Sequence, residues 1–129
     1  MTLRRHLGIA LLTILFASAA GAHHNMSALF DFDNRVTATG TLIKADWRNP
    51  HIQLTVEVSK DGQTETWGFE GPPPVFFKDR DISKADFEGA FGKTVTVEAS
   101  RARDGSRTGL LRTLTLPGGK FVSACPQNC

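Results

Sequence analysis

The segment from Val36 to Trp47 most constrains the fold, because it predicts one long strand whose buried face changes sides partway along. Its apolar positions form two successive alternations, first Val36, Ala38, Gly40 and Leu42, and then Ile43, Ala45 and Trp47. A change of phase beside a glycine indicates a β-bulge or a sharp bend. A strand bent in this way can serve both halves of a small barrel.

Four shorter strands are predicted after this segment. Alternation of apolar and polar residues marks a strand with one buried face, and Asp61-Gly62 suits the positive φ of a hairpin turn. Prolines 72–74 end the third strand because proline has no amide hydrogen to donate. Ser83 with Asp86 predicts a capped helix that Gly92 ends. The expected elements are strands at 52–58, 64–70, 93–99 and 109–116, a helix at 84–91, and a short extra edge at 120–122.

Three strands, a helical connection and two more strands are the element order of the OB-fold. The sequence therefore predicts an all-β domain, a small OB-like five-stranded partly open barrel with one short helix between strands 3 and 4. A simple antiparallel meander or a β-sandwich would give a similar pattern and is the alternative.

Residues 1–22 are typical of a secretory signal peptide. Arg4 and Arg5 precede an apolar stretch, and Ala20-Gly21-Ala22 fits an A-x-A cleavage site. The stretch of about 14 residues is shorter than the roughly 20 that a membrane helix needs, although an uncleaved anchor is the alternative. We expect cleavage after Ala22, a periplasmic location, no stable membrane anchor afterwards, and one domain over residues 23–129.

The charge balance disfavours nucleic acid as a partner. The chain has 15 basic and 13 acidic residues, and loss of Arg4 and Arg5 leaves 13 of each. A nucleic-acid-binding protein would usually show a basic surplus. No Ser-His-Asp set, phosphate-binding loop or paired-carboxylate cleft can be argued from the sequence, so enzymatic activity is not the expectation.

Three histidines follow the cleavage site: His23, His24 and His51. Cleavage after Ala22 would leave His23 with a free α-amine beside its imidazole, two nitrogens that can chelate one ion. His51 follows Pro50 at the corner between the first two strands and is expected to project from the barrel rim. Imidazole suits copper and zinc, and three nitrogens with an open position resemble known zinc centres.

The sharpest hypothesis is thus a copper or zinc site formed by these histidines. The alternatives are a terminus with no ligand role, and a His51 that only forms hydrogen bonds within its corner. Cleavage after Ala20 or Gly21 would instead place a histidine third, where Cu(II) binds amine, backbone amides and imidazole without a fold.

Cys125 and Cys129 are the only cysteines. An even count in an oxidising compartment indicates a disulfide, and a thiolate pair for a soft metal is the alternative. Trp47 and Trp67 fit the apolar alternation and are expected in the core. A groove that includes Trp47, Asn49 and Trp67 is the other interpretation.

Several motifs together are similar to a bacterial family of small exported proteins of unknown function. They are Ala22-His23-His24, Phe30-Asp31, Gly40-Thr41-Leu42, Trp47-Arg48-Asn49-Pro50-His51, Trp67 with Glu70, Val95-Thr96-Val97 and Ala102-Arg103-Asp104-Gly105-Ser106. The AHH start and the W-x-N-P-H motif carry most of this resemblance. It implies a periplasmic small β-barrel protein and supplies no activity, ligand or catalytic residue. Residues 72–92 and the cysteine-containing tail depart from the family pattern.

Three functions are therefore open. The first is a periplasmic binding protein for copper or zinc, using His23, His24 and His51. The second is a module that binds an envelope protein without metal. The third is a copper-dependent oxidase that uses the amino-terminal histidine.

Overall fold

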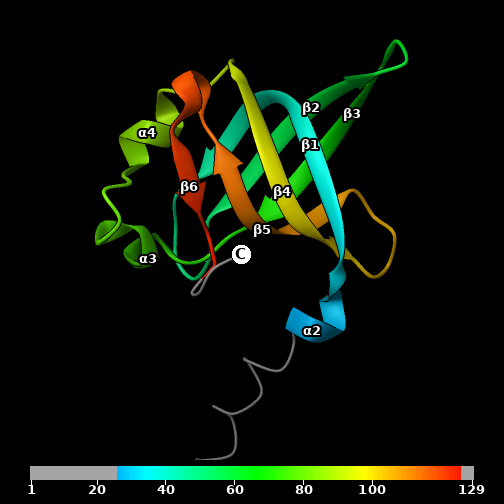
Figure 1. Cartoon of the computed structure of the whole chain (residues 1–129), viewed down its shortest axis with the longest axis horizontal. Coiled ribbons are helices and arrows are strands. Elements are labelled where there is room, and N and C mark those ends of the chain that lie inside the picture. Colours follow the sequence, from blue (N-terminus) through cyan, green and yellow to red (C-terminus); the bar gives the residue numbers. More distant parts are fainter. Residues whose placement is uncertain (1–25, 126–129) are drawn as a thin grey trace, which may run out of the picture.

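The protein is a small β-barrel with short helices on one flank, as a computed structural model of residues 26–125 shows (Figure 1). None of the helices in this range is long and apolar enough to cross a membrane. In chain order the elements are α2 (Met26–Leu29), β1 (Phe30–Asp46), β2 (Gln53–Lys60), β3 (Gln63–Glu70), α3 (Pro74–Lys78), α4 (Lys84–Glu88), β4 (Thr94–Ala102), β5 (Thr108–Thr115), the 3-10 turn η2 (Pro117–Gly119) and β6 (Phe121–Ser123).

The strands form one sheet that closes on itself. Their order is β3-β2-β1-β4-β5-β6. β3, at one edge of the sheet, also pairs in parallel with β5, and this pairing closes the barrel. Closure is partial, because only Thr108–Leu110 of β5 pair with β3, while Thr113–Thr115 pair with β6. The all-β, OB-like, partly open barrel that the sequence predicts is confirmed, with β6 as an added edge.

β1 is shared between both halves of the barrel. Its first part pairs with β4 and its second part with β2, and Thr41 has a partner in each. The pairing with β2 shifts register between Leu42 and Lys44, so Ile43 is the bulged residue. This is where the apolar phase changes in the sequence, and the predicted bulge is confirmed.

Two features differ from the sequence-based expectation. β1 begins at Phe30 rather than Val36, because Phe30 and Asp31 pair with the far end of β4 across another register shift. The connection between β3 and β4 contains two helices, α3 and α4, where the sequence predicted one. Pro74 starts α3 at a first-turn position that tolerates proline, and Ser83 and Asp86 form the predicted capping box of α4.

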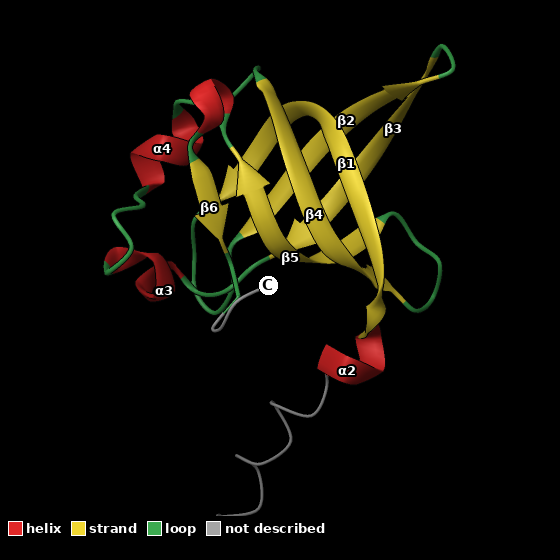
Figure 2. Ribbon diagram, viewed as in Figure 1, coloured by secondary structure: helices red, strands yellow, loops and turns green. Residues whose placement is uncertain are grey.

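Aliphatic side chains fill the barrel, and aromatic side chains close one end of it. The largest fully buried aliphatic residues on the strands are Leu42, Leu54, Val56, Val95, Val97, Leu114 and Val122. The helices α3 and α4, which lie one below the other on the β6 side of the barrel in Figure 2, bury Phe77 and Phe87. Both rings pack against Trp47, with centroid separations of 5.4 and 5.0 Å. Trp47 therefore anchors the helical connection to the barrel.

Replacement of Gly40 by alanine should strongly destabilise the fold. A Cβ there would overlap the backbone carbonyl oxygen of Glu57 and lie 2.8 Å from its carbonyl carbon, so β1 and β2 would have to separate. We expect Gly40→Ala to lower the free energy of unfolding by about 3 kcal/mol or more, as measured by urea denaturation.

Gly68→Ala is the matched control, because Gly68 also lies within a strand and its nearest neighbour to an added Cβ is the Thr108 methyl group at 3.7 Å. It should change the same free energy by less than about 1 kcal/mol. Equal effects at the two positions would show that the close approach at Gly40 is unimportant.

Candidate functional site

The corner between β1 and β2 is held firmly against the end of β3. Ile52 is 1% exposed; its amide donates to the Pro72 carbonyl at 3.2 Å, and its carbonyl accepts from the Gly71 amide at 2.9 Å. The peptide bond before Pro50 is cis. The corner thus presents His51, next to Ile52, from a fixed part of the barrel rim.

His51 is paired with a carboxylate that the sequence analysis did not assign to the site. Its Nδ1 lies 2.5 Å from Oε1 of Glu70, and both side chains are about one-third exposed. The ion pair involves Nδ1, and Nε2 lies across the imidazole ring from it. Carboxylates orient metal-binding histidines in this way.

One signal in the sequence could have located Glu70. The Asp61-Gly62 turn sets the register of the β2–β3 hairpin, in which Lys60 opposes Gln63 and Gln53 opposes Glu70. His51 is two residues before Gln53, so its side chain and that of Glu70 belong to the same end of the hairpin. The direct contact depends on how the corner folds back, which no local pattern specifies.

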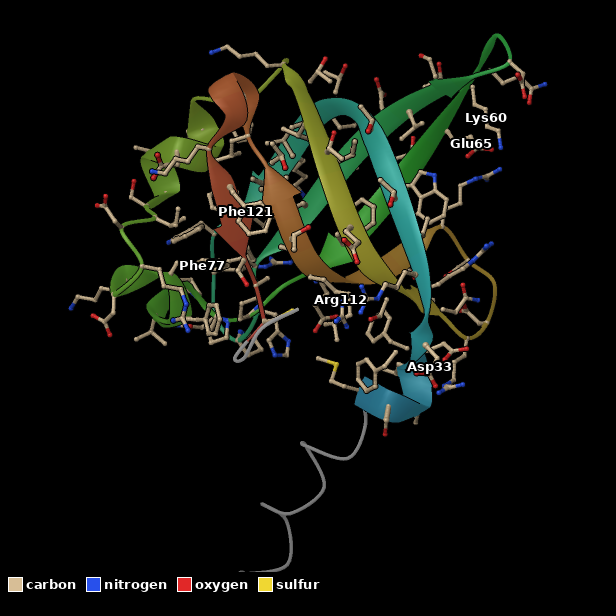
Figure 3. All side chains as sticks on the ribbon, viewed as in Figure 1. Asp33, Lys60, Glu65, Phe77, Arg112 and Phe121 are labelled. Carbon is tan, nitrogen blue, oxygen red and sulfur yellow. The ribbon has the colours of Figure 1, made fainter. Side chains whose placement is uncertain are left out.

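His51 also lines a small, largely apolar cavity of about 220 Å³ at the end of the barrel. Figure 3 labels Arg112 of β5, which lies at this end of the barrel, toward α2. The first and last described residues, Met26 and Cys125, both line the cavity. Its full lining is Met26, Phe32, His51, Gly71, Pro72, Ser100, Leu110, Leu111, Arg112, Ala124 and Cys125. The two ends of the described chain therefore meet beside His51.

The other predicted metal ligands, His23 and His24, lie outside the described residues, as does the predicted signal peptide. Within residues 26–125, no group of three or more His, Cys, Asp or Glu side chains comes together to hold a metal ion. Cys129 is also outside this range, so its disulfide with Cys125 stays a prediction.

The predicted groove residues do not share one cavity. Trp47 is half-buried and lines a cavity of about 710 Å³ beside α3 and α4. Trp67 is 8% exposed and lines another, of about 570 Å³, between the β2–β3 hairpin and the β4–β5 loop. Asn49 is exposed. Both tryptophans pack with the core, and a partner for either surface stays a prediction.

Glu65 and Arg107, which line the cavity at Trp67, form an ion pair. Glu65 Oε1 accepts from Arg107 at 3.1 Å, and Glu65 Oε2 accepts from the Trp67 indole N–H at 3.3 Å. Both hydrogen bonds lower the pKa of Glu65, and the one from Arg107 has the larger effect. Figure 3 shows Glu65 and Lys60 on the β2–β3 hairpin. Glu65 and Arg107 are thus paired with each other within the fold.

Comparison with known protein families gives a match for this chain. A family model described as a family of unknown function (DUF6152) matches residues 11–112. The chain belongs to this family. The match to DUF6152 includes His51 and Glu70 and ends before both cysteines. Comparisons with curated proteins and with solved structures each gave no match.

Asp86 of α4 connects the helical segment to Lys120, which directly precedes the edge strand β6. Lys120 Nζ donates to Asp86 Oδ1 at 2.8 Å, and the Ser83 amide donates to Oδ2 at 2.8 Å. The Lys120 hydrogen bond is the largest of the contacts that lower the pKa of Asp86 to about 2. The cavity beside Trp47 is therefore bordered by a carboxylate that stays ionised in mild acid.

Asp86→Asn should lose a stabilising contribution that depends on pH. A carboxyl with a lowered folded-state pKa stabilises the fold above its unfolded pKa of about 3.8, and this stabilisation is lost as pH falls through about 2. We expect wild type to be more stable than Asp86→Asn at pH 6, and the difference to shrink between pH 5 and pH 2, in urea denaturation.

Lys120→Met is the matched variant, since it removes the main cause of the lowered pKa. In the Lys120→Met background, Asp86→Asn should cost less at pH 6 than it does in wild type. An effect of Asp86→Asn that is the same at pH 6 and pH 2 would contradict this account.

Proposed function

We propose that this protein binds a copper or zinc ion at the rim of the barrel after export. His51 supplies a ligand from the folded domain, and His23 and His24 supply ligands from the amino-terminal segment. The observation that carries the proposal is the His51–Glu70 pair beside the cavity that Met26 also lines.

The distance within the pair assigns separate roles to the two side chains. An ion bonded to both atoms, at about 2.0 Å from each with near-tetrahedral geometry, would hold them about 3.3 Å apart. The observed Nδ1–Oε1 distance of 2.5 Å is shorter than that and fits a direct ion pair. Glu70 therefore orients the ring, and Nε2 of His51 is the atom that binds the ion.

The length of chain before Met26 supports the contribution of the histidine pair. His24 precedes Met26 by two residues, and an extended chain spans at most about 3.6 Å per residue. The Cα of His24 is thus within about 7 Å of the Cα of Met26, which itself lines the cavity with His51. An imidazole or an α-amine on this segment can reach the same ion.

The proposed role is capture of an ion for storage, delivery or sensing in the periplasm. Export rests on the signal-like residues 1–22 and their A-x-A site. The alternatives are a module that binds an envelope protein and a copper-dependent oxidase that uses His23. Neither has an observation in its favour as specific as the oriented His51.

Loss of His51 should abolish tight metal binding. The experiment uses protein recovered from its own secretion route, with the amino terminus read by intact mass, and titrates the apo form with Cu(II) and Zn(II) by calorimetry. We expect one ion to bind at sub-micromolar affinity, and His51→Ala to weaken it about 100-fold, because a ligand from the fold is removed.

Binding that is unchanged in His51→Ala would mean a chelate confined to the amino terminus and would overturn the rim site. Wild-type binding no tighter than that of free histidine would overturn metal binding altogether. In that case the interaction module would be the better model.

Loss of the Glu70 charge should weaken binding less than loss of His51. We expect Glu70→Gln to reduce affinity about tenfold, because the imidazole loses the anion that orients it. Glu65→Gln is the matched control: Glu65 is on the same strand, but it pairs with Arg107 and not with His51. Equal effects of the two substitutions would contradict a role for Glu70 at the site.

A further inference from the structure

We infer that the cavity beside Trp67 binds a small organic acid, an anionic group attached to a flat apolar body. The anionic group lies against Arg101 and Lys60, and the apolar body lies against Val36, Val58 and Trp67. All five residues line this cavity of about 570 Å³. The proposed metal site is beside a different cavity, so this inference goes beyond the proposed function and does not depend on it.

Three segments that are distant in the sequence form the walls of the cavity. They are the middle of β1, the β2–β3 hairpin and the β4–β5 loop, and the last two project from the same side of the barrel in Figure 1. The Gly68 amide donates to the Arg107 carbonyl at 3.0 Å, and the Arg107 guanidinium is 3.1 Å from Glu65. Within the loop, the Ser106 amide donates to Asp104 Oδ1 at 2.9 Å. Contacts within the fold thus set the walls, so a ligand does not have to order them.

The cavity has an excess of positive charge. Lys60, Arg101 and Arg107 line it, and Glu65 is the one carboxylate among the described residues of the lining. Glu65 is engaged by Arg107, whereas within residues 26–125 no side-chain hydrogen bond or ion pair involves Arg101 or Lys60. Arg101 is also half-buried, and burial of a charge without a counter-ion is unfavourable. A bound anion supplies that counter-ion.

The positive charge is confined to the cavity, which favours a small ligand over an extended polyanion. Asp61 directly follows Lys60 at the tip of the hairpin, and Asp104 lies in the β4–β5 loop. Hydrogen bonds from Ser106 lower the pKa of Asp104, so this carboxylate is ionised at neutral pH. An acidic peptide or a nucleic acid that extended past the cavity would meet these carboxylates.

The rest of the lining suits a flat apolar body. Val36 and Val58 are partly buried and pack against the core. The Trp67 ring is stacked on Phe69, with 6.1 Å between the ring centroids, and is thereby held in place. The cavity volume of about 570 Å³ is within the range of roughly 300–1,000 Å³ for small-molecule sites. Because arginine binds carboxylates through paired hydrogen bonds, an aromatic carboxylate matches both parts of the cavity.

The test measures the binding of naphthoate to the metal-free secreted protein by calorimetry. Naphthoate combines a carboxylate with a flat apolar body, naphthalenemethanol has the same body without the charge, and acetate has the charge without the body. We expect naphthoate to bind with a dissociation constant below about 100 μM, and each of the others to bind at least about tenfold more weakly. Amide NMR shifts should place bound naphthoate beside Trp67 and Gly105, which both line the cavity.

Arg101→Gln should weaken naphthoate binding about tenfold or more, because it removes a charged hydrogen-bond donor from the cavity. Lys60→Gln should weaken it about threefold, since Lys60 is exposed and solvent screens its charge. Arg35→Gln is the matched control and should change the affinity less than about twofold. Arg35 opposes Ser100, the residue before Arg101, in the pairing of β1 with β4. It forms an ion pair with Glu98 and does not line the cavity.

Four results would overturn the inference. Equal affinities for naphthoate and naphthalenemethanol would show a site that does not recognise charge. Equal losses in Arg35→Gln and Arg101→Gln would show attraction by the overall charge rather than by this cavity. Binding of hexaglutamate without binding of naphthoate would indicate a surface for an acidic macromolecule. Full affinity in Lys60→Gln would be the fourth, and it decides the question even where Arg101→Gln does not fold.

Discussion

The close approach of β1 to β2 at Gly40 is the constraint on which the barrel depends. A single strand can pair with β4 along one part and with β2 along the other only if it turns sharply between them, and Gly40 and the bulge at Ile43 provide that turn. Without a side chain at Gly40, the backbone of β2 can lie directly against it. The end of β1 is then directed to the corner that contains His51, so the position of the candidate site follows from the same bend.

Closure of the barrel assembles the candidate site from segments that are distant in the chain. The β1–β2 corner contributes His51, the end of β3 contributes Glu70, and the helix before β1 contributes Met26. The parallel pairing of β3 with β5 brings Arg112 to the same end.

Two surfaces that adjoin the β1–β2 corner have different chemistry. On the flank of α3 and α4, three aromatic rings pack together and the Asp86–Lys120 ion pair connects the helices to β6. These contacts are satisfied within the fold and explain its stability rather than a binding function. On the other side of the β1–β2 corner, His51 is paired with Glu70 through Nδ1. The metal proposal applies to this side of the corner alone.

Local patterns in the sequence determined the strand alternation, the Asp61-Gly62 hairpin, the capping box at Ser83 and the bulge beside Gly40, because each depends on residues close together in the chain. They did not reveal the start of β1 at Phe30 or the helix α3, since these depend on pairing with β4 and on packing against Trp47. The sequence predicted His51 as a candidate ligand because it follows Pro50 at the corner between the first two strands. Its partner Glu70, and the cavity it shares with Met26, were decided only by the tertiary structure, because barrel closure, a non-local event, sets which side chains meet at the rim.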